Sequence, residues 1–195
     1  GYGDPLYVNT GYPWREQFEN DPPNVPVENN HVGSYRRTVT VPDSWKGQQV
    51  IAHFGSVTSN IYLWVSGKYV GYSEDSKLEA EFDITRYVKP GENLIAFQTF
   101  RWCDGTYLED QDFFRFAGVG RDCYLYARPE KHIADIHIRA SLEEYNTRGI
   151  LDVKVDFSQQ AKGSKLKFVL REPKGETVLS HDASGNPAGA PCTLD

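Results

Sequence analysis

The sequence predicts an all-β protein made of two successive β-sandwich units. From Ser34 onward, short segments alternate apolar and polar residues with a period of two, as strands with one buried face do. Gly, Pro, Asn and Asp bound these segments, and the chain holds 17 Gly and 11 Pro. Helical periodicity is nearly absent, while an apolar content of 39% is enough for a packed core. These features favour packed sheets over any helical fold.

The first 33 residues are predicted to form an ordered extended loop. They are rich in Pro, Asn and Gly, and five prolines interrupt every candidate helix or central strand: Pro5, Pro13, Pro22, Pro23 and Pro26.

Regular strands follow this loop. Alternate residues between 35 and 41 share one face of the first strand, and alternate residues between 50 and 54 share one face of the next. Residues 60–65 and 69–72 are expected to form a hairpin in which Gly67 takes the positive φ angle. Further strands are predicted at Ala80–Ile84, Asn93–Trp102 and Asp122–Arg128.

A domain boundary is predicted near Pro129, which gives domains over residues 1–129 and 130–195. The second domain has predicted strands at 133–139, 149–157, 165–171 and 177–179, and a loop from 184 to the end. Because an immunoglobulin-like sandwich needs roughly seven strands and 100 residues, we expect the chain to stop inside this domain. An incomplete sandwich exposes apolar surface, so self-association is expected to cover five residues: Leu151, Val153, Val155, Leu166 and Phe168.

Charge and composition exclude several classes of protein. With 21 Lys+Arg against 27 Asp+Glu, the formal net charge is −6, so the chain lacks the excess of basic residues that nucleic-acid binding needs. No apolar run approaches the roughly 20 residues that span a bilayer, so we expect no membrane helix. The three widely spaced cysteines fit neither a disulfide framework nor a zinc site and are predicted to be free thiols.

The stretch most suggestive of chemistry is residues 101–112, RWCDGTYLEDQD. It mixes four carboxylates with aromatic side chains, as sugar sites do, because carboxylates accept hydrogen bonds from hydroxyls and aromatic faces pack on C–H surfaces. From composition alone, a solvated acidic loop is the favoured interpretation, and a site for a hard cation stays open. Glu109 and Asp112 are weak candidates for the carboxylate pair of a glycosidase, since nothing in the sequence fixes their separation. The sequence has no serine-nucleophile elbow, phosphate loop or EF-hand spacing.

Motifs distributed over residues 2–129 resemble, in order, the N-terminal sugar-binding domain of glycoside hydrolase family 2, and within it the large bacterial β-galactosidases. Residues 130–195 resemble, by position and strand pattern, the opening of the immunoglobulin-like domain that follows. The matching segments are Tyr7-Val8-Asn9, Tyr12-Pro13, 25–29, Gly33, Tyr35, Leu63-Trp64, Gly67, 70–72, Asp75-Ser76, 81–84, 91–93 and the whole run 101–112.

The resemblance implies a jelly-roll β-sandwich for residues 1–129 and a retaining β-galactosidase as the intact protein. In the family, the two catalytic glutamates lie on a later (β/α)₈ barrel, so this chain alone is expected to be inactive. A free-standing carbohydrate-binding module that borrowed the fold is the alternative. Because the chain opens without a Met, we expect it to be cut from a longer bacterial protein, cytoplasmic or periplasmic.

The resemblance also assigns site residues and partners. Asn9 and Asp104 are expected to bind the galactoside, and Asp104 to share a sodium ion with residues of the barrel. Magnesium is implied for the intact enzyme, and no cofactor is expected in this chain alone. The expected partners are the β-galactoside, the barrel of the same chain and further copies of the protein, with no nucleic acid and no membrane.

Three positions depart from the family pattern. Cys103 stands where serine is common, Phe114 where tryptophan is usual, and Gly120 where an aromatic residue usually precedes the arginine. Glu109, Asp110 and Asp112 are expected to fix the loop by bonding backbone amides and Arg115 or Arg121.

Overall fold

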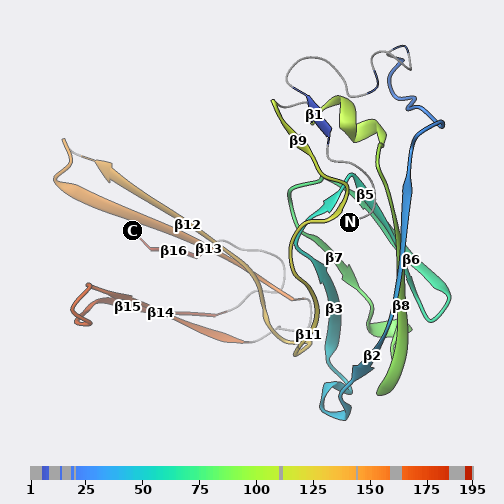
Figure 1. The fold of residues 1–195 in the computed structure, drawn as a ribbon. Coiled ribbons are helices and arrows are strands. Elements are labelled where there is room, and N and C mark those ends of the chain that lie inside the picture. The colour runs from blue at the N-terminus through green and yellow to red at the C-terminus, as the bar shows by residue number, and fades with distance from the viewer. Residues whose placement is uncertain are drawn as a thin grey trace. The chain divides into compact units, whose positions relative to one another are not determined.

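In a computed structural model, the chain is described at residues 6–8, 14, 19, 21–109, 112–143, 145–158, 164–184 and 192–194. It divides into two compact units, residues 1–127 and 128–195, which are taken one at a time below (Figure 1). Among the described residues, the regular elements are strands and three short 3-10 helices, so the all-β prediction is confirmed. None of the described helices is long and apolar enough to cross a membrane.

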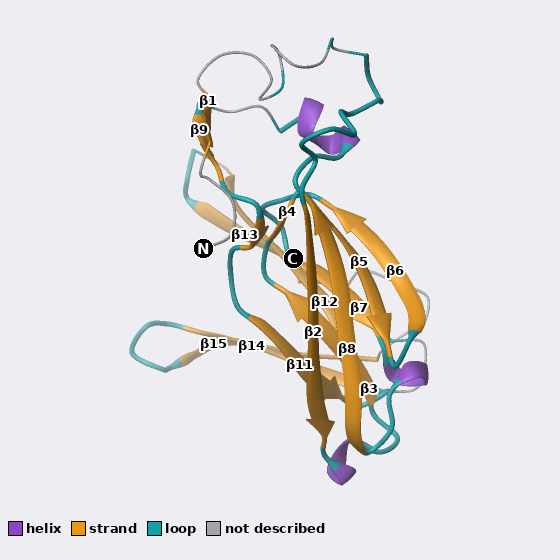
Figure 2. Ribbon diagram, turned by 45° about the vertical axis from the view of Figure 1, so that its right-hand side comes forward, coloured by secondary structure: helices purple, strands orange, loops and turns teal. Residues whose placement is uncertain are grey.

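The first unit is the expected β-sandwich of jelly-roll type. Its larger sheet has the order β2-β8-β5-β6, with antiparallel neighbours, and its smaller sheet has the order β11-β3-β7 (Figure 2). The strands are β2 (Val32–Val41), β8 (Gly91–Phe100), β5 (Asn60–Val65), β6 (Lys68–Glu74), β11 (Cys123–Arg128), β3 (Gln49–Phe54) and β7 (Ala80–Asp83). The 3-10 helices are η1 (Asp43–Trp45), η2 (Thr85–Tyr87) and η3 (Asp104–Tyr107).

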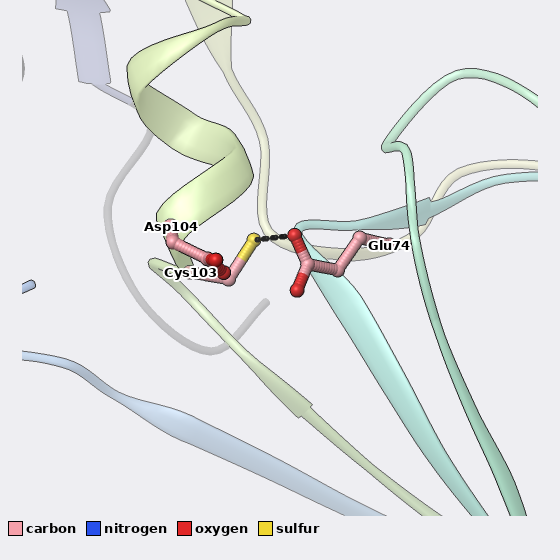
Figure 3. Close-up of side chains that lie close together, drawn as sticks. All are labelled: Glu74, Cys103 and Asp104. Atoms are coloured by element: carbon pink, nitrogen blue, oxygen red, sulfur yellow. Dashed lines mark hydrogen bonds between the residues drawn. The ribbon is translucent and has the colours of Figure 1, made fainter. Parts of the chain in front are cut away.

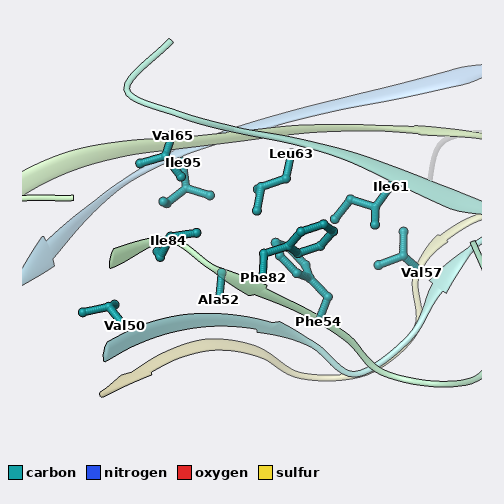
Figure 4. Packing of buried hydrophobic residues seen from close by; sticks show 10 residues of the cluster. All are labelled: Val50, Ala52, Phe54, Val57, Ile61, Leu63, Val65, Phe82, Ile84 and Ile95. Carbon is teal, nitrogen blue, oxygen red and sulfur yellow. The ribbon is translucent and has the colours of Figure 1, made fainter. Parts of the chain in front are cut away.

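The core of this unit lies between the two sheets, and strand alternation places its residues there. Ile61, Leu63 and Val65 of β5 are buried on one face, with Leu63 fully inaccessible. Phe54 and Phe82 belong to the same cluster and pack edge to face on each other, with ring centroids 6.1 Å apart. Figure 4 shows these side chains interlocked with those of β3, β7 and β8. The period-two pattern in the sequence therefore identifies this core correctly.

The predicted hairpin is present, and it has a tighter turn than expected. β5 and β6 are joined by Ser66 and Gly67, with φ angles of 50° and 79°. Two consecutive positive φ angles are those of a type I′ turn, whose twist matches that of the flanking strands. The sequence predicted one such angle, at Gly67.

The strand predicted at 93–102 instead spans Gly91–Phe100. It ends early because the Asn30 side chain, and not a neighbouring strand, pairs with both backbone groups of Trp102. The Asn30 amide oxygen accepts from the Trp102 N–H at 2.9 Å, and its amide nitrogen donates to the Trp102 carbonyl at 3.1 Å. It begins early because the buried Asn93 side chain closes the preceding turn through both Lys89 backbone groups.

Two short ladders were missed by the sequence analysis. β1 (Leu6–Val8) pairs with β9 (Phe113–Arg115), and β4 (Val57–Thr58) pairs with β10 (Gly118–Val119). β1 lies within the segment predicted to be entirely loop, so that prediction is wrong at residues 6–8. Strands of two or three residues carry too little alternation to be recognised, and their partners are far away in sequence.

The second unit contains the sheet β12-β13-β16 and the hairpin β14-β15. Its strands are β12 (Ile133–Glu143), β13 (Arg148–Phe157), β14 (Lys165–Arg171), β15 (Thr177–Ser184) and β16 (Cys192–Leu194). β12 and β15 are longer than predicted, and β16 replaces part of the predicted terminal loop because residues 192–194 find a pairing edge on β13.

The apolar face of this unit is only partly covered. Val153 and Val155 are buried, and Leu166 and Phe168 of β14 pack against them, so the cover expected from self-association is partly supplied by the chain itself. Ile136 and Ile138 of β12 lie opposite Val155 and Val153 and share their face, yet are 51% and 63% exposed.

Candidate functional site

Residues 101–109 form an ordered turn that is held in place by a small aromatic cluster. Trp102 and Tyr107 pack edge to face on Trp14, with ring centroids 5.7 and 5.1 Å from that of Trp14, and all three are buried. The Tyr107 hydroxyl donates to the carbonyl of Asn24 at 2.6 Å. The aromatic residues of this run therefore anchor the segment, which is more ordered than the solvated acidic loop that composition alone favoured.

Asp104 is the first residue of η3, and its side chain is exposed. The residue before it, Cys103, is the N-cap of η3 and exchanges hydrogen bonds with Thr106: the Cys103 N–H donates to the Thr106 hydroxyl at 3.1 Å, and the Thr106 N–H donates to the Cys103 carbonyl at 3.0 Å. This short cap fixes where η3 begins. It presents the Asp104 carboxylate to solvent from a rigid support.

The Asp104 carboxylate lies in a cluster with Glu74 and Cys103 (Figure 3). One ligand atom from each of the three lies within 4.8 Å of the others. Burial raises the pKa of the Cys103 thiol, and the Glu74 charge raises it further, so the thiol keeps its proton at neutral pH. The free-thiol prediction is confirmed for Cys103 and Cys123, while the Cys192 side chain lies outside the described residues.

Glu74 was not predicted from the sequence. Strand alternation places Tyr72 and Glu74 on the same face of β6, and Glu74 lies between two segments that matched the family, 70–72 and Asp75-Ser76. This place in the sequence was the signal that could have identified Glu74. Proximity to Asp104, 30 residues further along the chain, arises only from the tertiary fold.

Glu109 fixes the loop by accepting from a backbone amide, as predicted, and from a serine hydroxyl. Its two carboxylate oxygens accept from the Ser76 N–H at 2.8 Å and the Ser76 hydroxyl at 2.5 Å, and Ser76 is buried. Arg121 instead donates to the carbonyls of Gly55 and Lys77. With both oxygens engaged, Glu109 is a structural carboxylate and is poorly suited to general acid catalysis.

The remaining candidates lie at β1 and β9. Asp112 accepts a hydrogen bond from the Tyr7 hydroxyl, and the Tyr7 ring packs on Phe114 at 5.2 Å. These contacts tie β1 to the end of the 101–112 run, and Figures 1 and 2 draw β1, β9 and η3 at the same end of the sandwich. Asn9 directly follows β1, but Asn9 and Asp110 lie outside the described residues.

A hollow elsewhere in the first unit differs in chemistry from the Asp104 region. A groove of about 680 Å³ opens between β2 and β11, lined largely by apolar side chains that include Val39, Phe54 and Phe97. No carboxylate lines it, so it lacks the acceptors that distinguish the Asp104 region.

Comparison with known proteins gives a consistent answer. Residues 1–129 match the family described as glycosyl hydrolases family 2, sugar binding domain. The chain is 44% identical to a β-galactosidase of Priestia megaterium over 92% of its length, and 40% identical to one of Streptococcus thermophilus over 97%. It spans 18% of the length of each of these relatives.

Solved structures share the fold at lower identity. A Bacteroides uniformis β-glucuronidase superposes with a TM-score of 0.70 at 21% identity, covering 85% of this chain and 21% of that one. A calcium-binding mutant of Bacteroides uniformis β-glucuronidase 2 superposes with a TM-score of 0.69 at 21% identity. The match covers 88% of this chain and 22% of that one. The match of the sugar-binding domain over residues 1–129, two thirds of the sequence, shows that this chain belongs to glycoside hydrolase family 2.

Proposed function

We propose that this chain is the N-terminal part of a retaining β-galactosidase, with a sugar-binding jelly-roll domain over residues 1–129 and the opening of an immunoglobulin-like domain over 130–195. The observation that carries the proposal is the 38–45% identity to proteins named β-galactosidase, over 78–97% of this chain. The similar β-glucuronidase structures have about half that identity. A (β/α)₈ barrel elsewhere in the same polypeptide supplies the acid and the nucleophile.

In this proposal, the chain contributes one wall of the galactose pocket. Asp104 is exposed at the start of a braced turn, so its carboxylate accepts hydrogen bonds from sugar hydroxyls. Asn9 follows β1, which a hydrogen bond from Tyr7 to Asp112 links to the same run, and its amide both donates to and accepts from a hydroxyl.

Asp104 also suits a sodium ion shared with barrel residues. Sodium is a hard cation that prefers oxygen donors, and the Asp104 carboxylate is exposed at the start of η3, whereas the protonated Cys103 thiol beside it is a poor ligand for sodium. A bound cation would supply a fixed positive charge for a sugar oxygen. Magnesium is proposed for the intact enzyme, as the resemblance to the family implies.

A substrate panel tests the proposal. The full-length enzyme is expected to hydrolyse an aryl β-galactoside with a kcat/KM about 10²-fold above that for the matching β-glucuronide or β-mannoside. The glucuronide carboxylate would meet the negative charge of Asp104, and the mannoside presents its hydroxyls in the wrong directions. The 195-residue chain assayed alone is expected to show no turnover. A preference for the glucuronide, or hydrolysis by the chain alone, would contradict the proposal.

The intact protein, placed in the bacterial cytoplasm or periplasm, is further proposed to be a homo-oligomer. The exposed Ile136 and Ile138 support this, because they leave part of the apolar face of the second unit uncovered. Light scattering of the chain at high concentration is expected to give a mass above the monomer, and Ile138→Lys to restore the monomer. Val178→Lys, at a residue 65% exposed on β15, is the matched control and is expected to leave the mass unchanged. A strictly monomeric wild-type chain would contradict a role of Ile136 and Ile138 in self-association.

A further inference from the structure

Glu74 occupies an unusually constrained position at the end of β6. One carboxylate oxygen accepts from the Tyr72 hydroxyl. The other accepts from the N–H of Gly105 at 3.2 Å and from the Cys103 thiol at 3.7 Å (Figure 3). The carboxylate therefore joins the larger sheet to the first turn of η3, on both sides of Asp104 in sequence.

The sheet side of this connection continues into the sandwich. The Asn60 amide nitrogen lies 3.4 Å from the Tyr72 hydroxyl, and the Asn60 amide oxygen accepts from the backbone N–H of Phe100 at 2.9 Å. Asn60 is only 4% exposed. Since buried polar networks are rigid when satisfied, the Glu74 carboxylate is held by β5 and β8 as well as by its own strand.

The turn side is shaped to receive the carboxylate. A Cβ atom placed on Gly105 would lie 2.8 Å from the nearer Glu74 oxygen, which is closer than real Cβ contacts come. The glycine at position 105 therefore leaves room for the carboxylate to reach the backbone N–H. Any larger residue there would push Glu74 away.

We propose that Glu74 is a positioning residue that holds the first turn of η3 so that Asp104 faces the bound galactoside. The inference rests on the proposed function of Asp104. Both Glu74 oxygens are engaged by protein groups, so Glu74 acts through the turn and does not touch the sugar. A turn that is already ordered costs no entropy when the substrate binds, and the benefit is seen in KM.

Two substitutions in the full-length enzyme separate the effect of side-chain length at position 74 from the effect of its charge. Glu74→Gln keeps the length and loses the charge; its amide oxygen still accepts from Gly105, so KM for an aryl β-galactoside is expected to stay within about 3-fold of wild type. Glu74→Asp keeps the charge and is one methylene shorter, so it loses the contact and is expected to raise KM about 10-fold with little change in kcat. If Glu74 instead bound a cation, Glu74→Gln would raise KM more than Glu74→Asp does, and that result would overturn the inference.

Gly105→Ala displaces the carboxylate from the other side without altering it. It is expected to reproduce the KM of Glu74→Asp. Hydrogen–deuterium exchange of the peptide covering residues 103–108 supplies a readout independent of activity: exchange is expected to accelerate in Glu74→Asp and Gly105→Ala and to stay at the wild-type rate in Glu74→Gln. Unchanged exchange in the first two variants would refute the positioning role.

The Asp104→Ala variant, measured in parallel, distinguishes failure of the proposed role of Asp104 from failure of the positioning role of Glu74. If Asp104→Ala leaves the kinetics unchanged, the proposed role of Asp104 fails. If Asp104→Ala is impaired while Glu74→Asp behaves as wild type in both KM and exchange, the positioning role alone fails. With both ideas correct, adding Glu74→Asp to Asp104→Ala produces no further rise in KM.

Discussion

Replacing Asp104 by alanine in the full-length enzyme is expected to lower kcat/KM for an aryl β-galactoside by about 10²- to 10⁴-fold. The carboxylate is proposed to accept from two sugar hydroxyls, and hydrogen bonds to a charged group contribute about 1.5–3 kcal/mol each when water is excluded. Steady-state kinetics of the purified variant measure the effect.

The matched control is Asp43→Ala, at an exposed aspartate in the first turn of η1. It also removes one surface carboxylate from a 3-10 helix, and it is expected to stay within about 2-fold of wild type. If Asp104→Ala were as active as Asp43→Ala, the assignment of Asp104 to the pocket would be wrong.

Replacing Leu63 by alanine is expected to lower the free energy of unfolding of the first unit by about 3–5 kcal/mol. Leu63 is fully inaccessible at the centre of β5, between the two sheets, so its removal leaves a cavity that rigid neighbours cannot close (Figure 4). A urea titration followed by tryptophan fluorescence measures the loss, because Trp64 and Trp102 lie in the same unit.

Leu78→Ala provides the comparison at an exposed leucine. Its side chain is 63% accessible, so the same change of residue is expected to cost less than about 0.5 kcal/mol. Equal losses for the two variants would show that the packing between the sheets is not what stabilises this unit.

Much of the sandwich could be predicted because its strands are long enough to show their period. Ile61, Leu63 and Val65 alternate with partly exposed residues, and Gly67 marks the turn. The ladders β1-β9, β4-β10 and β13-β16 could not be predicted, because strands of two or three residues depend on partners that only the tertiary fold supplies.

The candidate site was predictable in part. Asp104 was singled out by the resemblance of residues 101–112 to the family, and its role in binding stays a prediction; the loop-fixing role expected of Glu109 is confirmed. Glu74 was not found, because its contacts with Gly105 and Cys103 join segments about 30 residues apart. Trp14 was placed in a loop because of the surrounding prolines, although it is buried against two aromatic residues of the run.

The central claim is that this chain supplies only part of a galactose pocket. Calorimetric titration of the 195-residue chain with galactose and lactose, with and without sodium, tests it most directly, and the same titration of the full-length enzyme is the control. We expect no detectable binding to the chain and clear binding to the full-length enzyme, because a pocket needs contacts from several sides. Millimolar or tighter binding by the chain, lost in its Asp104→Ala variant, would contradict the account and identify a self-sufficient carbohydrate-binding module.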